Sequence, residues 1–249
     1  MLLNQFRLIL TALAFLTRIP VPAWVGYADT QLNQSVRYFP LIGLLVGTLL
    51  AGVYSLSALL WPPGLALLVA LAVGLMLTGA FHEDGLADFY DGVFGGLTVE
   101  RRLEIMKDSR VGTYGVLALL AVLGLKFAAL LSVPPVSVPL ILVAGHGLSR
   151  VFAVSFIYTH DYARSSGGKV QVVAQGLSLP ALGLALLIGV LPLLWLPINV
   201  LWLLLPLLLL RLWLARTLTS KLGGYTGDAL GAAQQLSETV FYLGVAALL

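Results

Sequence analysis

The chain has 249 residues, of which 59% are hydrophobic and only 10% are charged, and its net charge is +3. Soluble domains carry about 25% charged residues, so a chain this poor in charge has too few polar groups to cover a globular surface. The composition therefore predicts an all-α, polytopic integral membrane protein. The absence of cysteine excludes a disulfide framework and a thiol nucleophile, and the small net charge offers no basic face for nucleic acid.

The first segment, MLLNQFRLILTALAFLTRIP, is a poor signal peptide because Arg7 interrupts its apolar run and no small-residue cleavage site follows. On a helix, Asn4, Gln5 and Arg7 fall near one side, whereas Leu3 and Phe6 fall near another. This pattern favours an N-terminal amphipathic helix lying on the membrane. A first spanning helix is the alternative.

Seven later segments are apolar enough to read as membrane-spanning helices, which need about 20 mainly apolar residues. No internal repeat or linker separates them, so we expect one domain, 1–249. The expected spans lie at roughly 39–60, 63–81, 114–133, 138–158, 178–196, 198–216 and 235–249.

The connections between these spans are of two alternating kinds. The turns WPPG, SVPPVSVP and LPIN carry no charge, whereas the connections at 82–113, 159–177 and 211–234 carry Lys and Arg, as does the N-terminal stretch. Because Lys and Arg in short loops stay on the cytoplasmic side, we expect these charged connections and the active site on the cytoplasmic face. No expected span carries a central carboxylate.

The stretch HEDGLADFYD at 82–91 places a histidine and four acids directly after the expected membrane span 63–81. On a helix, Asp84, Asp88 and Asp91 would lie within about 60° of one another. Carboxylates that close repel one another, so either some are protonated or a cation such as Mg²⁺ lies between them. The alternative is a solvated acidic loop, but acids beside a membrane helix typically mark a site. His82 and Glu83 fall off this face.

The segment 97–115, LTVERRLEIMKDSRVGTYG, predicts a short interfacial helix that Thr98 caps. Asp108, Ser109 and Arg110 follow at its end. An arginine at this position is suited to clamp a phosphate group, because a guanidinium donates two parallel hydrogen bonds to it. The alternative is that the basic residues of this segment only keep it on the cytoplasmic side of the membrane.

These motifs resemble a known family. HEDGLADFYDG is similar to the H-x-DGLAD-x-x-DG signature of the cobalamin synthases, which are adenosylcobinamide-GDP ribazoletransferases. Further segments resemble that family in family order, from near the N-terminus to the last expected span. They are LTRIPVP, RYFPLIGLLVG, RRLEIMKDSRVGTYG, Ser149–Arg150, YAR and GGYTGDALGAAQQLSE.

The resemblance implies a Mg²⁺-dependent phosphotransferase of the bacterial-type cytoplasmic (inner) membrane. Such an enzyme joins adenosylcobinamide-GDP to α-ribazole or its 5′-phosphate, forms adenosylcobalamin or its 5′-phosphate, and releases GMP. The ribose 3′-hydroxyl of α-ribazole would attack the phosphorus nearer the cobinamide. The lipid bilayer is the expected surrounding, and the formation of an oligomer stays open.

The expected roles follow from the acidic face and the resemblance together. Asp84, Asp88 and Asp91 would hold Mg²⁺, and one of these acids, or His82, would take the proton of the attacking hydroxyl. Expected substrate-binding residues are Arg37, Asp108, Ser109, Arg110, Arg150, Arg164, Gly224 and Asp228.

Two further polar residues lie in expected spans. Glu238 belongs either to the site or to a buried ion pair, and His146 is expected to be a packed, hydrogen-bonded histidine.

Two rival functions are another membrane phosphotransferase of the CDP-alcohol type, whose motif spacing differs, and a cation-coupled transporter. The position of the acids at one membrane face disfavours the transporter.

Overall fold

The computed structural model describes residues 2–163 and 176–249, which form helices joined by short turns. Within these ranges the only strand-like feature is an isolated bridge between Tyr162 and Tyr225. The α-helices are α1 (Leu2–Leu16), α2 (Asp29–Ser35), α3 (Phe39–Ser57), α4 (Pro63–Thr78), α5 (Phe81–Gly95), α6 (Val99–Ile105), α7 (Thr113–Ser132), α8 (Val138–Thr159), α9 (Leu179–Val190), α10 (Leu204–Thr217) and α11 (Gly227–Leu248).

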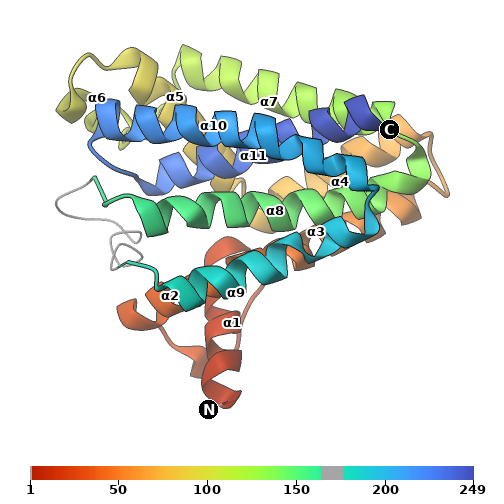
Figure 1. Cartoon of the computed structure of the whole chain (residues 1–249), viewed down its shortest axis with the longest axis horizontal. Coiled ribbons are helices and arrows are strands. Elements are labelled where there is room, and N and C mark those ends of the chain that lie inside the picture. Colours follow the sequence, from red (N-terminus) through yellow and green to blue (C-terminus); the bar gives the residue numbers. More distant parts are fainter. Residues whose placement is uncertain (1, 164–175) are drawn as a thin grey trace.

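The long helices run side by side along the longest axis of the molecule (Figure 1). α3 packs against α8, and α11 packs against α5, α7 and α8. Small residues permit the close crossing of α3 and α8: a Cβ on Gly47 would lie 2.8 Å from the Cα atom of Val143. Helix pairs in membranes are held by this kind of close van der Waals packing, because lipid gives no hydrophobic drive between helices.

Four helices in the described residues are long and apolar enough to span a membrane, or five if one bent pair counts as a span. The four are Asp29–Ser57, Thr113–Ser132, Pro135–Thr159 and Ile198–Leu222. This confirms a polytopic all-α membrane protein, but it does not confirm the count of seven. The expected span 178–196 corresponds to a shorter apolar helix, Leu179–Trp195.

The last helix begins earlier than expected, at Gly227 and not at residue 235. Hydropathy misses its first turns because they are rich in Gly, Ala and Gln. Gln234 and Gln235 are nevertheless buried, as is Glu238. Their burial among partners from other helices explains why a polar segment can lie inside the bundle.

The bent pair is α4 and α5, whose axes differ by 85°. The expected span 63–81 therefore ends at Thr78. Gly79 and Ala80 both adopt the left-handed conformation, with φ of 65° and 53°. A non-glycine residue in this region is strained by roughly 1–2 kcal/mol, and such strain is concentrated at functional sites.

The N-terminal helix α1 runs crosswise to α3 and α8 and projects from the bundle (Figure 1). Its 15 residues are too few to cross a bilayer at about 1.5 Å per residue. Leu2, Leu3 and Phe6 are exposed along it. These features favour the interfacial helix over a first spanning helix.

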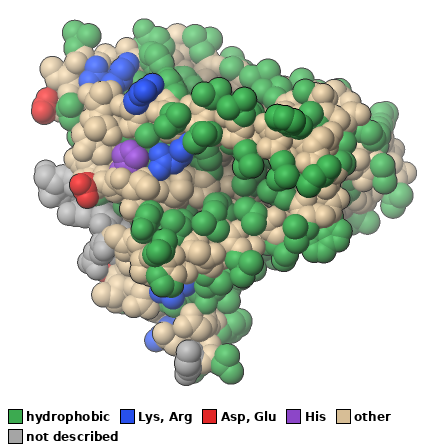
Figure 2. Space-filling view, viewed as in Figure 1, with side chains coloured by type: hydrophobic (Ala, Val, Ile, Leu, Met, Phe, Trp, Pro, Cys, Tyr) green, Lys and Arg blue, Asp and Glu red, His purple; other side chains and the backbone are tan. Residues whose placement is uncertain are grey.

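Hydrophobic and charged side chains occupy different parts of the surface. Figure 2 shows hydrophobic side chains spread across the visible face, with the charged ones gathered at one end of the bundle and on the part formed by α1 and α2. The exposed large apolar side chains of the molecule include Leu194, Trp195, Ile198, Trp202 and Leu204. A face of this composition suits lipid.

Candidate functional site

The three aspartates of the acidic face all lie on α5, but they differ in exposure. Asp84 is exposed, Asp88 is half-buried and Asp91 is buried. A carboxylate one helical turn from the next can share a cation with it, since residues four apart lie on one helix face. Asp84 and Asp88 are thus the accessible pair.

Asp91 makes specific contacts with the start of α7. Its Oδ2 accepts a hydrogen bond from Gly112 N at 2.7 Å, and its Oδ1 accepts one from Gly115 N at 2.9 Å. A carboxylate at a helix N-terminus accepts hydrogen bonds from N–H groups that have no partner within the helix. It is also attracted by the positive end of the helix dipole. Asp91 therefore fastens α7 to α5, and both of its oxygen atoms have protein donors.

Within residues 2–163 and 176–249, no group of three or more His, Asp and Glu side chains is arranged to hold a metal ion. The metal role of Asp84, Asp88 and Asp91 thus stays a prediction. The accessible pair fits a hard cation in one respect: Mg²⁺ commonly binds one or two carboxylates and completes its shell with water and substrate phosphates.

The glycine-rich segment before α11 meets α5. Thr226 caps α11 by accepting a hydrogen bond from Ala229 N at 3.1 Å, and Asp228 lies in the first turn. A Cβ on Gly85 would lie 3.0 Å from the Cα atom of Asp228. The acidic motif and the second predicted motif are therefore in direct contact.

Gly224 lies against the end of α8. Its φ is 156°, and a Cβ at this position would meet the carbonyl oxygen of Asp161. Next to it, Tyr225 N donates a hydrogen bond to that carbonyl at 2.9 Å. The glycine thus serves a close backbone approach, and a substrate contact through Gly224 stays a prediction.

His82 and Arg150 are buried between α5, α8 and α11, and both line small cavities of about 30 and 40 Å³. His82 lies away from the acidic face, as the helical spacing predicts. Its catalytic role stays a prediction, as does the substrate contact of Arg150.

Arg150 belongs to a buried network centred on Glu238. Arg150 Nη1 donates to Glu238 Oε2 at 3.1 Å, and Lys126 Nζ donates to Glu238 Oε1 at 2.8 Å. His146 Nδ1 lies 2.7 Å from Arg150 Nη1. The buried-pair interpretation of Glu238 is thus confirmed, and His146 is packed and hydrogen-bonded as expected.

Glu238 also corrects one expectation, since it lies midway along α11 and is therefore a central carboxylate in a bundle helix. Lys126, in the middle of α7, was missed altogether. Window-averaged hydropathy hides one lysine among leucines, but an ionisable residue inside a span is itself a signal.

The network reaches the acidic helix through Gln235. Lys126 Nζ donates to Gln235 Oε1 at 2.6 Å, and Gln235 Nε2 donates to Glu83 Oε1 at 2.7 Å. Glu83 is the residue directly before Asp84, so α5 is tied to α7 and α11 on its buried side. This leaves the opposite side of α5, with Asp84, open to solvent.

The remaining predicted residues that the structure describes make their contacts outside this network. Asp108 and Arg110 form an exposed ion pair, and the hydrogen bonds from Arg110 lower the pKa of Asp108 to about 2. Ser109 between them is exposed. Arg37 Nε donates to Gln34 O at 2.8 Å. Arg164 lies outside the described residues.

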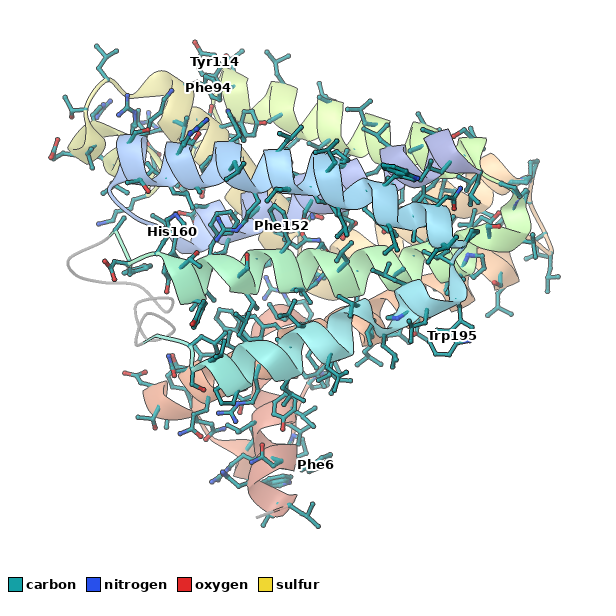
Figure 3. All side chains as sticks on the ribbon, in the orientation of Figure 1. Phe6, Phe94, Tyr114, Phe152, His160 and Trp195 are labelled. Carbon is teal, nitrogen blue, oxygen red and sulfur yellow. The ribbon has the colours of Figure 1, made fainter. Side chains whose placement is uncertain are left out.

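An aromatic cluster marks the far end of α5. Phe94 packs with Tyr114 at 5.9 Å between ring centroids, and Lys221 Nζ lies 5.4 Å from the Phe94 ring. Figure 3 shows Phe94 and Tyr114 together at one end of the bundle, with Trp195 at the other. Aromatic side chains are enriched at both membrane–water interfaces, so these positions are consistent with the two ends of a membrane-embedded bundle.

A cavity beside the acidic helix has a volume of about 560 Å³. It lies between α1 and the bend that joins α4 to α5. Asp84 lines it together with Arg18, Phe15, Tyr27 and Gly79. It is large enough for part of a nucleotide-sized ligand, since small-molecule sites typically measure about 300–1,000 Å³.

Comparison with known proteins gives a consistent result. The family described as cobalamin-5-phosphate synthase matches residues 8–246. A protein from Shewanella frigidimarina named adenosylcobinamide-GDP ribazoletransferase is 45% identical, covering 99% of this chain and 96% of its own length. One of the same name from Ralstonia pickettii is 44% identical, covering 98% and 96%. No solved structure matches the chain.

Proposed function

The chain belongs to the cobalamin-5-phosphate synthase family, and we propose that it transfers the adenosylcobinamide phosphate of adenosylcobinamide-GDP to α-ribazole or its 5′-phosphate. The relatives from Shewanella and Ralstonia carry the name of this transferase. The products would be adenosylcobalamin, or its 5′-phosphate, and GMP. This is the late step in which the nucleotide loop of the cobalamin is completed.

The reaction is a substitution at phosphorus. The ribose 3′-hydroxyl of α-ribazole forms a bond to the phosphorus nearer the cobinamide, and the bond from that phosphorus to the bridging oxygen breaks. The bridging oxygen leaves with GMP, and the hydroxyl loses its proton to a base. His82 is buried, so we assign the proton to an accessible carboxylate of α5, Asp84 or Asp88.

Asp84 and Asp88 would also hold Mg²⁺. When bound, the ion would neutralise charge on the diphosphate and on the leaving phosphate. Asp91 orients the helix that bears this pair, because it joins α5 to the start of α7. Asp228, in the turn of α11 that meets Gly85, would face the same substrate.

The observation that supports this assignment best is the meeting of two motif segments. HEDGLAD on α5 and GGYTGDALGA at the start of α11 are far apart in sequence, yet they touch at Gly85 and Asp228. They lie beside a cavity of about 560 Å³ that Asp84 lines. We place this end of the bundle on the cytoplasmic face of a bacterial inner membrane, because the basic connections belong to it.

The test is the conversion of defined substrates by purified protein in liposomes. Adenosylcobinamide-GDP and α-ribazole are supplied with Mg²⁺, and both GMP and the corrinoid product are quantified. The proposal predicts equal amounts of the two products, formed only when α-ribazole and Mg²⁺ are both present. Folded protein that forms neither product would contradict the transferase and favour the transporter alternative.

A further inference from the structure

The cavity beside the α4–α5 bend contains a basic residue that none of the motif interpretations uses. Arg18 follows α1, is exposed, and lines this cavity with Asp84. An arginine and a carboxylate on the wall of one cavity, with no ion pair between them, present charges of both signs to a ligand.

The backbone holds Arg18 in place against the bend. Arg18 N donates a hydrogen bond to Leu77 O at 2.7 Å, in the last turn of α4. The guanidinium then lies across Gly79: a Cβ there would clash with Arg18 Nε and would lie 2.9 Å from Nη2. Gly79 is thus required for its left-handed φ of 65° and for the room it leaves to this side chain.

Arg18 differs from the arginines that the sequence singled out and the structure describes. Arg37, Arg110 and Arg150 each donate hydrogen bonds to protein acceptors. In the described part of the chain, the Arg18 side chain makes neither an ion pair nor a hydrogen bond. A guanidinium held in position without an acceptor is suited to receive an anionic ligand, above all a phosphate, which it can bind through two parallel hydrogen bonds.

We infer that the cavity binds the diphosphate of adenosylcobinamide-GDP and that Arg18 donates hydrogen bonds to a phosphate oxygen. This inference rests on the proposed function. Adenosylcobinamide-GDP carries a diphosphate whichever acceptor is used, whereas α-ribazole itself carries no phosphate. Arg18 on one wall, and a cation held at Asp84 on the other, would then both offset the negative charge of the diphosphate. Arg18 is a substrate-binding residue that adds to the predicted ones.

Equilibrium binding tests this inference without turnover. Detergent-purified wild type, Arg18→Gln and Arg18→Lys are titrated with adenosylcobinamide-GDP and, separately, with α-ribazole, in EDTA so that no Mg²⁺ contributes. Glutamine keeps most of the side-chain stem and removes the charge, whereas lysine keeps the charge. Arg7→Gln is the matched control, because Arg7 lies on α1 outside the cavity and bonds to Trp24 O.

We expect Arg18→Gln to weaken binding of adenosylcobinamide-GDP by about 10- to 100-fold, which is the range for one charge-assisted hydrogen-bond site. Arg18→Lys should restore part of the loss, and α-ribazole should bind all forms equally. Unchanged binding of adenosylcobinamide-GDP in Arg18→Gln, or a selective loss of α-ribazole, would overturn the inference. Wild type that binds both substrates but forms no product would contradict the proposed function alone.

Discussion

Asp91 holds two backbone N–H groups at the start of α7, so its carboxylate joins α5 to α7 with or without a cation. An amide at this position has only one oxygen, and its NH₂ group would face an N–H donor. We expect Asp91→Asn to lower the free energy of unfolding by about 1–3 kcal/mol, the cost of leaving a buried donor unsatisfied. Thermal unfolding in detergent with EDTA measures this.

Asp84→Asn is the control for that measurement, since Asp84 is exposed on the same helix. It should leave the unfolding temperature in EDTA nearly unchanged. If Asp91→Asn were equally harmless without metal, Asp91 would have no structural role and the assignment of its two hydrogen bonds would be wrong.

Asp108 and Arg110 give a prediction about pH. The hydrogen bonds from Arg110 lower the pKa of Asp108 from 3.8 to about 2. Because the pKa is lower in the folded chain, this pair stabilises the fold above the unfolded pKa, and the contribution is lost as the pH falls through about 2. The pair lies at the surface, so its effect on stability is small.

A carbon-13 titration of the Asp108 carboxyl group measures that pKa directly. Removing the guanidinium with Arg110→Gln should return the pKa toward 3.8. A wild-type midpoint near 3.8 would show that the ion pair does not form in solution.

At the scale of the helices, the buried network predicts that two mutations within it destabilise the protein by different amounts. Glu238 accepts hydrogen bonds from both Lys126 and Arg150, so its removal leaves two buried cations without a carboxylate. Removal of Lys126 leaves Glu238 paired with Arg150. Breaking a buried pair on one side costs about 3–5 kcal/mol. We therefore expect Glu238→Gln to destabilise the protein more than Lys126→Met.

Unfolding midpoints of the two variants, compared in one detergent, decide the order. Because Met fills much of the volume of the lysine stem, Lys126→Met tests the charge more than the packing. A larger loss in Lys126→Met than in Glu238→Gln would contradict a network centred on Glu238.

The helices themselves could be predicted where an apolar run has clear ends. The expected spans 114–133 and 138–158 differ from α7 and α8 by at most one residue at each end. The bend after α4 could not be predicted, because it depends on Ala80 in a left-handed conformation that alanine rarely adopts. The early start of α11 was missed because polar residues lower hydropathy even when partners bury them.

The candidate site could be predicted only in part for the same reason. The helical spacing of Asp84, Asp88 and Asp91 predicts a shared face. It does not reveal that the Asp91 carboxylate accepts hydrogen bonds from backbone N–H groups at the start of α7. Partners contributed by other helices, such as Lys126 to Glu238, depend on tertiary packing. A single sequence contains no direct signal for such pairs.

At the scale of the whole molecule, the charged side chains are concentrated in one part of the surface and are sparse over the rest. Figure 2 shows charged side chains gathered toward one end of the bundle and on α1 and α2, with hydrophobic side chains spread across the rest of the visible face. The central carboxylate of α11 does not itself favour the transporter, because Glu238 is neutralised by two cations that hold it in place. Asp84 of α5 lines the cavity that α1 and Arg18 help to form.

The central claim is that the accessible acids of α5 form the catalytic site. The most direct measurement is the rate of GMP release, at saturating adenosylcobinamide-GDP, α-ribazole and Mg²⁺, by Asp88→Asn and by Glu104→Gln. Glu104 is an exposed acid on α6 that pairs with Arg101. We predict a loss of at least about 100-fold in Asp88→Asn, as expected when a group that binds the catalytic ion is removed, and a normal rate in Glu104→Gln. A normal rate in folded Asp88→Asn would contradict the account.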